Sequence, residues 1–496
     1  MITNNSYIDW PTHRQMRNSL LKSFDKIYIY DLHWNARKKE VCPDGSKDEN
    51  VFDIMQWVCI IFAVKTSNKK SEEAQVFHYD SRWKRSVKYD RLREGEIWNI
   101  QWIELNPDKE YHFFVPKDFG KQKKYEKWIA INELFEIYNS WVESQKDALT
   151  IKLDKESVIQ VVENFKHLSV DELKNKYNLT DWRDRKTNKA KEDLMDNKWD
   201  ICPISYRPFD IRRTCYTWQS RWFLAYPRDE VMHHMLKNNI WLIVKRWFTE
   251  KKSAPWFVSS FIIDRRWWTC PWMQWAESLM PLYLYEDEKS LELWQKYRPN
   301  FNADLLAQIE NQLWMKCNQK AKLEESNLSQ KWATEFTPTD LFDYIYAVLH
   351  SPKYRETYKE FLKINFPRVP FNVDRSTFWY LVEKGRELRL FHLLEHPRLS
   401  EKSDIAVYSW EWEEIIAFAD YSDNKVYING DKYFDNVPKE AWEFYIWWYQ
   451  PAQRRFKDRK WREMTFDDIT HYQKMIISLN ETIRLMKLID MINFID

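Results

Sequence analysis

Hydrophobic and polar positions over residues 1–65 predict strands and helices in turn. Residues 2–4 have the character of a strand end, and residues 14–24 carry apolar side chains at helical spacing. Residues 27–32 and 58–64 are short apolar runs typical of buried strands. The order of strand, helix, strand, loop and strand predicts part of an α/β sheet, and not a complete one.

The pattern is weaker between residues 70 and 200. Three apolar stretches predict short strands, and two longer stretches have helical spacing. We expect the strands at residues 74–79, 100–105 and 111–115, and the helices at residues 127–149 and 157–177. The tract 180–198 is strongly polar and charged, which favours an exposed connector.

Two stretches in the C-terminal part of the chain have clear helical spacing. They are residues 344–350, with the sequence YIYAVLH, and residues 476–488, which include the apolar Ile477, Ile483 and Leu488. Each pattern is more typical of a core helix than of a contact surface. The chain is therefore expected to be α/β, with a helical part near its C-terminus.

Arginines and aromatic residues alternate densely in residues 206–236, YRPFDIRRTCYTWQSRWFLAYPRDEVMHHML. Planar guanidinium groups suit phosphate oxygens and the edges of guanine. The aromatic residues Tyr206, Phe209, Tyr216 and Phe223 would serve as hydrophobic anchors. The pattern thus indicates nucleic-acid binding by five arginines, Arg207, Arg212, Arg213, Arg221 and Arg228.

A plainer interpretation of the same segment is equally open from composition. Pro208 presets a turn, and Asp210 is suited to cap the next element or to pair with Arg212 or Arg213. On this view, the motif Arg-Pro-Phe-Asp is ordinary turn chemistry.

Charge narrows the possible nucleic-acid surface to local clusters. The chain has 77 Lys plus Arg against 75 Asp plus Glu in 496 residues, a net charge of +2. It is therefore no polycation, and a binding footprint must be local. Further clusters are Arg265 with Arg266, residues 37–39, and a C-terminal stretch with Arg454, Arg455, Lys457, Arg459, Lys460 and Arg462. The C-terminal stretch fits phosphate contact, with a solvated surface loop as the rival interpretation.

The sequence indicates no metal site and no catalytic residue in this chain. The six cysteines are scattered without a CxxC pair, and His233 and His234 are adjacent, which is not the spacing of paired zinc ligands. Asp171 and Glu172-x-Lys174 superficially resemble the magnesium-binding set of restriction nucleases, but an expected helix carries them, so we reject that function. No leader sequence or membrane-length apolar run is present, and we expect a cytoplasmic location.

Glycine and tryptophan counts are anomalous. The chain has 5 glycines and 29 tryptophans, and their sum is close to the roughly 35 glycines that average usage of about 7% gives at this length. Trp34, Trp218 and Trp461 lie where turn chemistry favours glycine. We hypothesise that many tryptophans are glycines in the native protein, encoded by UGA in a lineage that reads this codon as glycine. The alternatives are a protein truly rich in tryptophan, using indoles to stack on bases or glycans, and an artificial sequence.

Ordered motifs across nearly the whole chain resemble one family. Thr3-Asn4-Asn5-Ser6, Tyr30-Asp31-Leu32-His33 and Val51-Phe52-Asp53-Ile54 resemble the closing half of the methyltransferase domain of type ISP and type IIG restriction-modification enzymes. Residues 141–147, WVESQKD, resemble a Gly-x-x-Thr/Ser-x-Arg/Lys-Asp element of that family. Residues 342–350, 366–370 and 447–451 resemble its target-recognition region, the last as a Gly-Gly-Tyr-Gln-Pro turn if the tryptophans replace glycines.

The resemblance implies an N6-adenine DNA methyltransferase of a restriction-modification system, with S-adenosylmethionine as cofactor and double-stranded DNA as partner. It implies an incomplete Rossmann-like methyltransferase sheet, marked by Asn4, Asn5 and Ser6, followed by a mixed α/β recognition domain. We expect a methyltransferase remnant at residues 1–70, a connector at 71–200 and the recognition domain at 201–496. It also implies glycine at Trp10, Trp34, Trp57, Trp141, Trp218, Trp222, Trp447, Trp448 and Trp461.

Two family motifs have no counterpart in this sequence. Neither a Phe-x-Gly-x-Gly loop for S-adenosylmethionine nor the Asn/Asp-Pro-Pro-Tyr motif that holds a flipped adenine is found. We expect a missing upstream methyltransferase or nuclease portion, and no methylation or cofactor binding by this chain alone. The rival hypothesis is a stand-alone DNA-specificity subunit that lends recognition to a separate catalytic chain.

Overall fold

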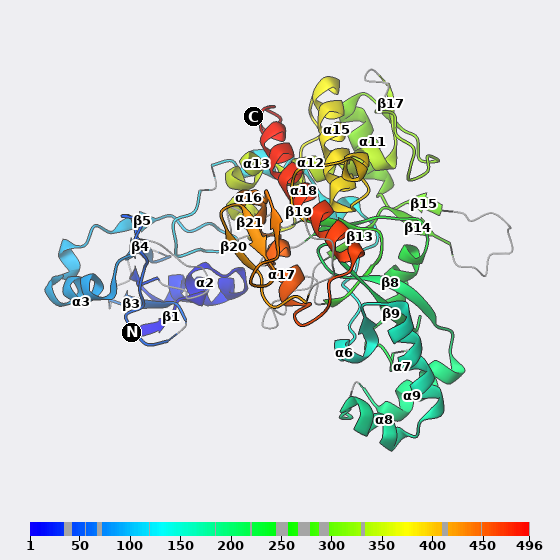
Figure 1. Ribbon diagram of the computed structural model, residues 1–496. Helices are drawn as coiled ribbons and strands as arrows, with labels where there is room; N and C mark the ends of the chain where they lie inside the picture. Colours follow the sequence, from blue (N-terminus) through cyan, green and yellow to red (C-terminus); the bar gives the residue numbers. More distant parts are fainter. Residues whose placement is uncertain are drawn as a thin grey trace. The chain divides into compact units, whose positions relative to one another are not determined.

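A computed structural model divides the chain into two compact units, Met1–Gly120 and Lys121–Asp496 (Figure 1). Each unit has its own sheets and buried core. The structure describes residues 1–33, 42–54, 56–66, 72–118, 120–183, 185–218, 221–244, 256–265, 278–286, 297–328, 333–408, 415–447 and 449–495. The expected domain boundaries near residues 70 and 200 stay predictions.

The first unit is built on a five-stranded sheet with the order β1-β3-β2-β4-β5. Strand β3 is antiparallel to both β1 and β2, while β2 and β4 are parallel. The strands are β1 (Ile2–Asn4), β2 (Lys26–Asp31), β3 (Val58–Val64), β4 (Gln75–Asp80) and β5 (Ile103–Leu105), with helices α1 (Ser6–Asp9), α2 (Arg14–Ser23) and α3 (Arg85–Glu94). The elements predicted over residues 1–65 are confirmed to within two residues.

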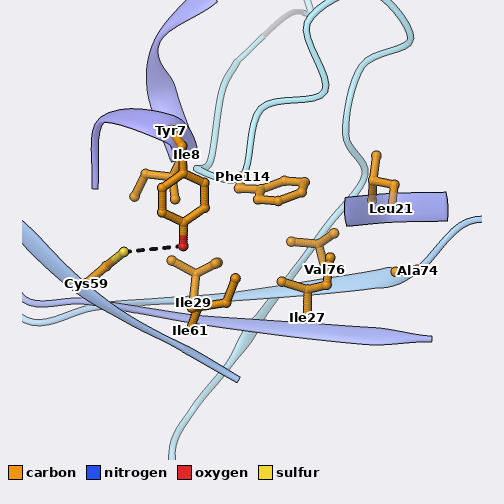
Figure 2. Packing of buried hydrophobic residues seen from close by; sticks show 10 residues of the cluster. All are labelled: Tyr7, Ile8, Leu21, Ile27, Ile29, Cys59, Ile61, Ala74, Val76 and Phe114. Atoms are coloured by element: carbon orange, nitrogen blue, oxygen red, sulfur yellow. Dashed lines mark hydrogen bonds between the residues drawn. The ribbon is translucent and has the colours of Figure 1, made fainter. Parts of the chain in front are cut away.

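One face of this sheet forms the core shown in Figure 2. Alternating residues of β2, Ile27 and Ile29, are fully buried on this face, as the two-residue period of a strand requires. Tyr7 and Ile8 from α1 and Leu21 from α2 lie over them (Figure 2). The amphipathic spacing of residues 14–24 therefore serves to cover the sheet.

The strand predicted at residues 111–115 is wrong, because this segment is irregular. The fully buried Arg17 of α2 donates to the carbonyl oxygens of Tyr111, at 2.6 and 2.9 Å, and of Trp10, at 2.8 Å. Burial lowers the pKa of Arg17 to about 10. The carbonyl oxygen of Tyr111 thus accepts hydrogen bonds from the Arg17 side chain, whereas in a strand it would accept one from the backbone of a neighbouring strand.

The helix predicted at residues 127–149, near the start of the second unit, is wrong. A short strand β6 (Ile129–Ala130) and two single-turn helices, α5 (Ile131–Leu134) and α6 (Asp147–Thr150), replace it. Between them the chain is extended, and Asn139, Val142 and Glu143 pair with Leu279, Asp264 and Tyr226. The spacing of apolar residues that are buried by such distant pairing can match the periodicity of a helix.

The helix predicted at residues 157–177 is two helices, α7 (Lys155–His167) and α8 (Val170–Tyr177). Ser169 divides them as the N-cap of α8, in a capping box with Glu172. The connector predicted at residues 180–198 is also wrong in part, because it contains α9 (Thr187–Asp196), whose Ala190 and Leu194 are buried. Glu172, a nuclease candidate rejected from the sequence, thus has a capping role.

Small sheets form the middle of the second unit. The strands β12 (Ile262–Ile263), β8 (Asp200–Arg207), β9 (Asp210–Tyr216) and β7 (Ile151–Lys152) make one sheet in this order, and β11 (Phe257–Ser259), β10 (Trp241–Val244) and β13 (Ser278–Pro281) make another. Further pairs are β14 (Tyr283–Tyr285) with β15 (Tyr297–Pro299), β16 (Lys316–Cys317) with β17 (Glu335–Phe336), and β18 (Arg368–Val369) with β6. A last sheet orders β19 (Val407–Tyr408), β22 (Tyr433–Asp435), β21 (Lys425–Tyr427) and β20 (Asp420–Ser422).

Helices α12 (Pro338–His350), α15 (Arg375–His392) and α18 (Phe466–Ile489) pack side by side (Figure 1). Every residue of α12 is buried. Gly385 of α15 allows the close approach, because a Cβ atom there would lie 1.8 Å from the backbone oxygen of Asp343. The helices predicted around residues 344–350 and 476–488 are confirmed.

The remaining helices of the second unit are short, apart from α11. They are α4 (Gln122–Tyr125), α10 (Asp229–Met232), α11 (Ala303–Leu313), α13 (Pro352–Thr357), α14 (Lys359–Leu362), α16 (Lys439–Trp442) and α17 (Pro451–Lys457). No described helix is both long and apolar enough to span a membrane. The predicted mixed α/β class, with several small sheets, is confirmed.

Candidate functional site

The arginine-rich segment begins as a tight hairpin between β8 and β9. Pro208 and Phe209 form its turn, and Phe209 has a φ of 61°. Asp210 starts β9 and accepts a bond from Arg212 Nη2 at 2.9 Å. The turn and the ion pair that the plainer interpretation expected are therefore both present.

The aromatic residues of the segment are anchors inside the protein. Tyr206, Phe209, Tyr216 and Phe223 are all buried. The guanidinium of Arg212 lies 3.8 Å from the centre of the Tyr206 ring, and that of Arg207 lies 5.0 Å from it. The rings thus hold arginines in place, as cation–π contacts do.

Asp210 is the centre of a buried ion cluster that joins the hairpin to the C-terminal helices. Its carboxylate lies 2.7 Å from Arg459 and 3.7 Å from Arg455. Burial raises the pKa of Asp210, but Arg459, Arg212 and Arg455 outweigh it and hold the pKa well below its usual range. Asp468 of α18 completes the cluster at 3.0 Å from Arg455.

The predicted C-terminal basic stretch therefore divides into two groups. Arg455 and Arg459 point inward and are buried, and burial lowers the pKa of Arg455 to about 10. Arg454, Lys457, Lys460 and Arg462 are exposed. Only this outward group has the accessibility that phosphate contact needs.

Two arginines of the segment 206–236 and the distant Arg265 gather around Tyr226 and Glu143. Arg221 lies 4.8 Å and Arg228 5.1 Å from the centre of the Tyr226 ring. Arg265 Nη1 lies 3.2 Å from a Glu143 carboxylate oxygen. A basic surface thus forms where residues 221–228 meet the distant Arg265.

The other predicted residues have varied positions. Arg207 is buried beneath Tyr206 and also faces the ring of Tyr449 at 5.7 Å. Arg213 is half-buried on β9 and has no ion-pair partner among the described residues. Arg266, residues 37–39, Trp34 and Trp448 lie outside the described residues.

Sequence reasoning missed Tyr226, Glu143 and Asp147, which orient the arginines. Asp147 accepts a hydrogen bond from the Tyr206 hydroxyl at 3.3 Å. The one available signal was the element at residues 141–147, which was noted without a role. Its partners lie too far along the chain for local patterns to identify them.

The candidate methyltransferase residues lie at the end of β1. Asn5 is buried and its amide donates to Asp31 Oδ1 at 3.0 Å, while Asn4 Oδ1 accepts from the Ser6 N–H at 2.8 Å. These side chains are thus bonded to the protein itself. Within the described ranges, no group of three His, Cys, Asp or Glu side chains is placed to hold a metal ion.

Comparison with known proteins gives one family and several similar folds. The family model described as the Type ISP C-terminal specificity domain matches residues 133–488. No curated protein sequence matches significantly.

Three solved structures are similar over 98% of this chain. An ATP-dependent Type ISP restriction-modification enzyme, LlaBIII bound to DNA, has 17% identity and a TM-score of 0.68, and 33% of that chain is covered. The DrdV–DNA complex has 18% identity, a TM-score of 0.65 and 50% coverage. A nuclease-deletion mutant of the Type ISP enzyme LlaGI, in complex with a DNA substrate mimic, has 18% identity, a TM-score of 0.63 and 45% coverage. This chain therefore spans a third to a half of the length of the chains it matches.

Proposed function

The chain belongs to the Type ISP C-terminal specificity domain family, and we propose that it recognises a specific sequence in double-stranded DNA. The observation that carries the proposal is the gathering of Arg221, Arg228 and Arg265 around Tyr226 and Glu143, inside the matched range. Guanidinium groups bind phosphate oxygens and guanine edges, which are the two kinds of contact that DNA recognition needs.

The exposed and buried cations have different proposed roles. Arg213, Arg221, Arg228 and Arg265, with the exposed Arg454, Lys457 and Lys460, are the candidates for DNA contact. The buried Arg207 and Arg455 have a structural role, because Arg207 packs on the Tyr206 ring and Arg455 lies near the Asp210 carboxylate. Phosphate contacts fix the register of the protein on the duplex, and a few base contacts then read the sequence.

We further propose that recognition by this chain directs methylation of adenine at N6, with S-adenosylmethionine as methyl donor, in a restriction-modification system. The resemblance of residues 3–6, 30–33 and 51–54 to a methyltransferase domain supports this proposal. The residues present do not fit the cofactor by themselves, because Asn4 and Asn5 bond to Ser6 and Asp31. None of the five glycines lies in a Phe-x-Gly-x-Gly loop. No catalytic step is therefore assigned to this chain.

Selection from a random duplex library tests the recognition proposal. The full chain is expected to enrich one sequence motif and to bind it at least about 10³-fold more tightly than random duplex. The logarithm of the association constant should fall linearly with the logarithm of salt concentration, as release of counterions from phosphates requires.

A charge-removal variant provides the control. Arg221→Gln, Arg228→Gln and Arg265→Gln together should weaken binding to all duplexes while leaving the thermal unfolding midpoint close to that of the parent chain. Equal binding of the selected motif and random DNA by the parent chain would contradict the proposal.

A further inference from the structure

We infer that residues 142–147 form a bracket that positions the arginines on the phosphodiester backbone of duplex DNA. This inference rests on the proposed function and assigns a role to the sequence VESQKD. The bracket contacts two stretches of the arginine-rich segment 206–236 and the more distant residues 263–265, and each of the three carries predicted DNA-binding arginines. Its contacts are main-chain hydrogen bonds, one ion pair between a carboxylate and a guanidinium, and one hydrogen bond from a tyrosine hydroxyl.

The first contact holds Arg265. Val142 N–H donates to the carbonyl of Ile263 at 2.9 Å, and Arg265 N–H donates to the carbonyl of Val142 at 2.9 Å. The Glu143 carboxylate then lies 3.2 Å from the Arg265 guanidinium, whose side chain is 51% exposed. Both the backbone and the head group of Arg265 are therefore set by the bracket, with half of the side chain left accessible to a phosphate.

The second contact holds Arg221 and Arg228 through Tyr226. Glu143 and Tyr226 exchange two main-chain hydrogen bonds, at 2.9 and 3.1 Å, which fix the position of the ring. The two guanidinium groups lie 4.8 and 5.1 Å from the ring centre. A guanidinium near an aromatic ring keeps donors for other acceptors, because the ring occupies a face of the cation and not all of its N–H groups.

The third contact reaches the β8–β9 hairpin. The Tyr206 hydroxyl donates to Asp147 at 3.3 Å, and Ser144 bonds to the same carboxylate group. Burial, and then the nearby Asp147, raise the pKa of Tyr206 to about 12, so the hydroxyl stays a donor at neutral pH. The Tyr206 ring lies beneath Arg212 at 3.8 Å. The same bracket therefore also orients the arginines of the hairpin.

The phosphodiester backbone is the ligand that this arrangement suits. Arginines fixed at several points on one scaffold match a polyanion with regularly repeated charges. Pairing of Arg265 with Glu143 and stacking on tyrosine restrict the guanidinium groups before DNA arrives. This restriction lowers the entropy cost of binding.

The salt dependence of duplex binding by the full chain tests the bracket. Tyr226→Leu removes the ring under two arginines while keeping the main-chain pairing. It is expected to reduce the slope of log association constant against log salt by about 1.8, because each phosphate contact contributes about 0.9. Affinity for selected and random duplexes should fall by the same factor. Tyr226→Phe keeps the ring and should restore the slope.

Two further variants provide a control for the loss of a tyrosine ring and a direct removal of the two charges. Tyr433→Leu removes a tyrosine ring that lies 4.0 Å from Lys425 in the sheet of β21 and β22, and should leave the slope unchanged. The double variant Arg221→Gln and Arg228→Gln removes the two proposed phosphate contacts themselves, so it should lower the slope as much as Tyr226→Leu.

The possible outcomes are decisive for the bracket. A folded Tyr226→Leu chain with the parent slope overturns it, as does an equal loss in Tyr226→Phe. If Tyr226→Leu does not fold, an unchanged slope in the glutamine double variant overturns it. In each case, sequence-selective binding by the parent chain leaves the proposed function standing, whereas its absence contradicts the proposed function itself.

Discussion

Tryptophan occupies backbone conformations that suit glycine at four described positions. Trp218, Trp314, Trp447 and Trp461 have φ angles of 51°, 55°, 56° and 66°. Residues with a Cβ atom are disfavoured in this left-handed region by about 1–2 kcal/mol, while glycine enters it freely. Trp314 was not singled out from the sequence, yet it caps the C-terminal end of α11, where glycine is the usual residue. Glycine suits the backbone at these four positions, whereas Trp10, Trp57, Trp141 and Trp222 have no positive φ, and the hypothesis of native glycine stays a prediction.

Replacing these tryptophans by glycine should stabilise the protein. Trp314 and Trp461 have exposed fractions of 84% and 71%, so their removal loses little burial. We expect Trp314→Gly and Trp461→Gly each to lower the free energy of the folded state by about 1 kcal/mol and to raise the thermal unfolding midpoint. Trp98→Gly is the matched control, because Trp98 is also 84% exposed but lies in the 3-10 helix Ile97–Asn99 without a positive φ. A rise of the midpoint in Trp98→Gly equal to the other two would contradict the backbone argument.

Individual elements differ in how far the sequence alone could predict them. Residues 344–350 bury a helix on all sides, and their continuous apolar run was sufficient. Residues 127–149 show similar spacing, but Val142 and Glu143 pair with residues 122 and 83 positions away. Local periodicity cannot distinguish a buried helix from a segment whose apolar residues are covered by distant strands. The elements that failed are therefore those made by long-range pairing.

The same limit applied to the ion cluster around Asp210. Pro208 and Asp210 allowed the turn and a local ion pair with Arg212 to be predicted. The partner Arg459 is 249 residues further along the chain, so its inward orientation had no local signal. The cations of the C-terminal basic stretch predict a single charged surface from the sequence, whereas two of them, Arg455 and Arg459, are buried in the ion cluster.

Asp210 should contribute stability that depends on pH. Removing one partner of a buried ion cluster typically costs about 3–5 kcal/mol. Asp210→Asn leaves three guanidinium groups without this carboxylate, and should lower the thermal unfolding midpoint at pH 7 by several degrees. Because the pKa of Asp210 is lowered in the folded state, its contribution is complete above the unfolded value of about 3.9 and is lost as pH falls through the folded value.

Thermal unfolding between pH 7 and pH 2 checks this expectation. The difference between the parent chain and Asp210→Asn should stay constant down to about pH 4 and then shrink. Asp431→Asn is the control, since this carboxylate is 77% exposed and pairs with Lys432 at only 3.8 Å. Asp431→Asn should change the thermal unfolding midpoint very little at any pH. A difference for Asp210→Asn that persists unchanged to pH 2 would contradict the lowered pKa.

At the scale of the whole molecule, the proposed binding of a polyanion by a chain with a net charge of +2 requires a local concentration of cations. The structure turns some cations inward and gathers others at the surface. Family membership and the mixed α/β class could be predicted from ordered motifs, because these are spread along the sequence. The arrangement of arginines around residues 142–147 could not, because three separate segments create it.

The exposed C-terminal cations have two interpretations from the sequence, phosphate contact and a solvated surface loop. Arg454, Lys457 and Lys460 project outward from a segment that the buried Arg455 and Arg459 fix to Asp210. A rigidly anchored group of exposed cations suits phosphate contact better than a freely moving solvated loop, because less entropy is lost on binding. We therefore expect Arg454→Gln, Lys457→Gln and Lys460→Gln together to reduce the salt slope of duplex binding by about 2.7, at about 0.9 for each contact. The exposed Lys320, Lys322 and Lys402, changed to glutamine together, remove the same charge elsewhere and should leave the slope unchanged. Equal slopes in the two triple variants would show instead that the C-terminal cations only solvate the surface.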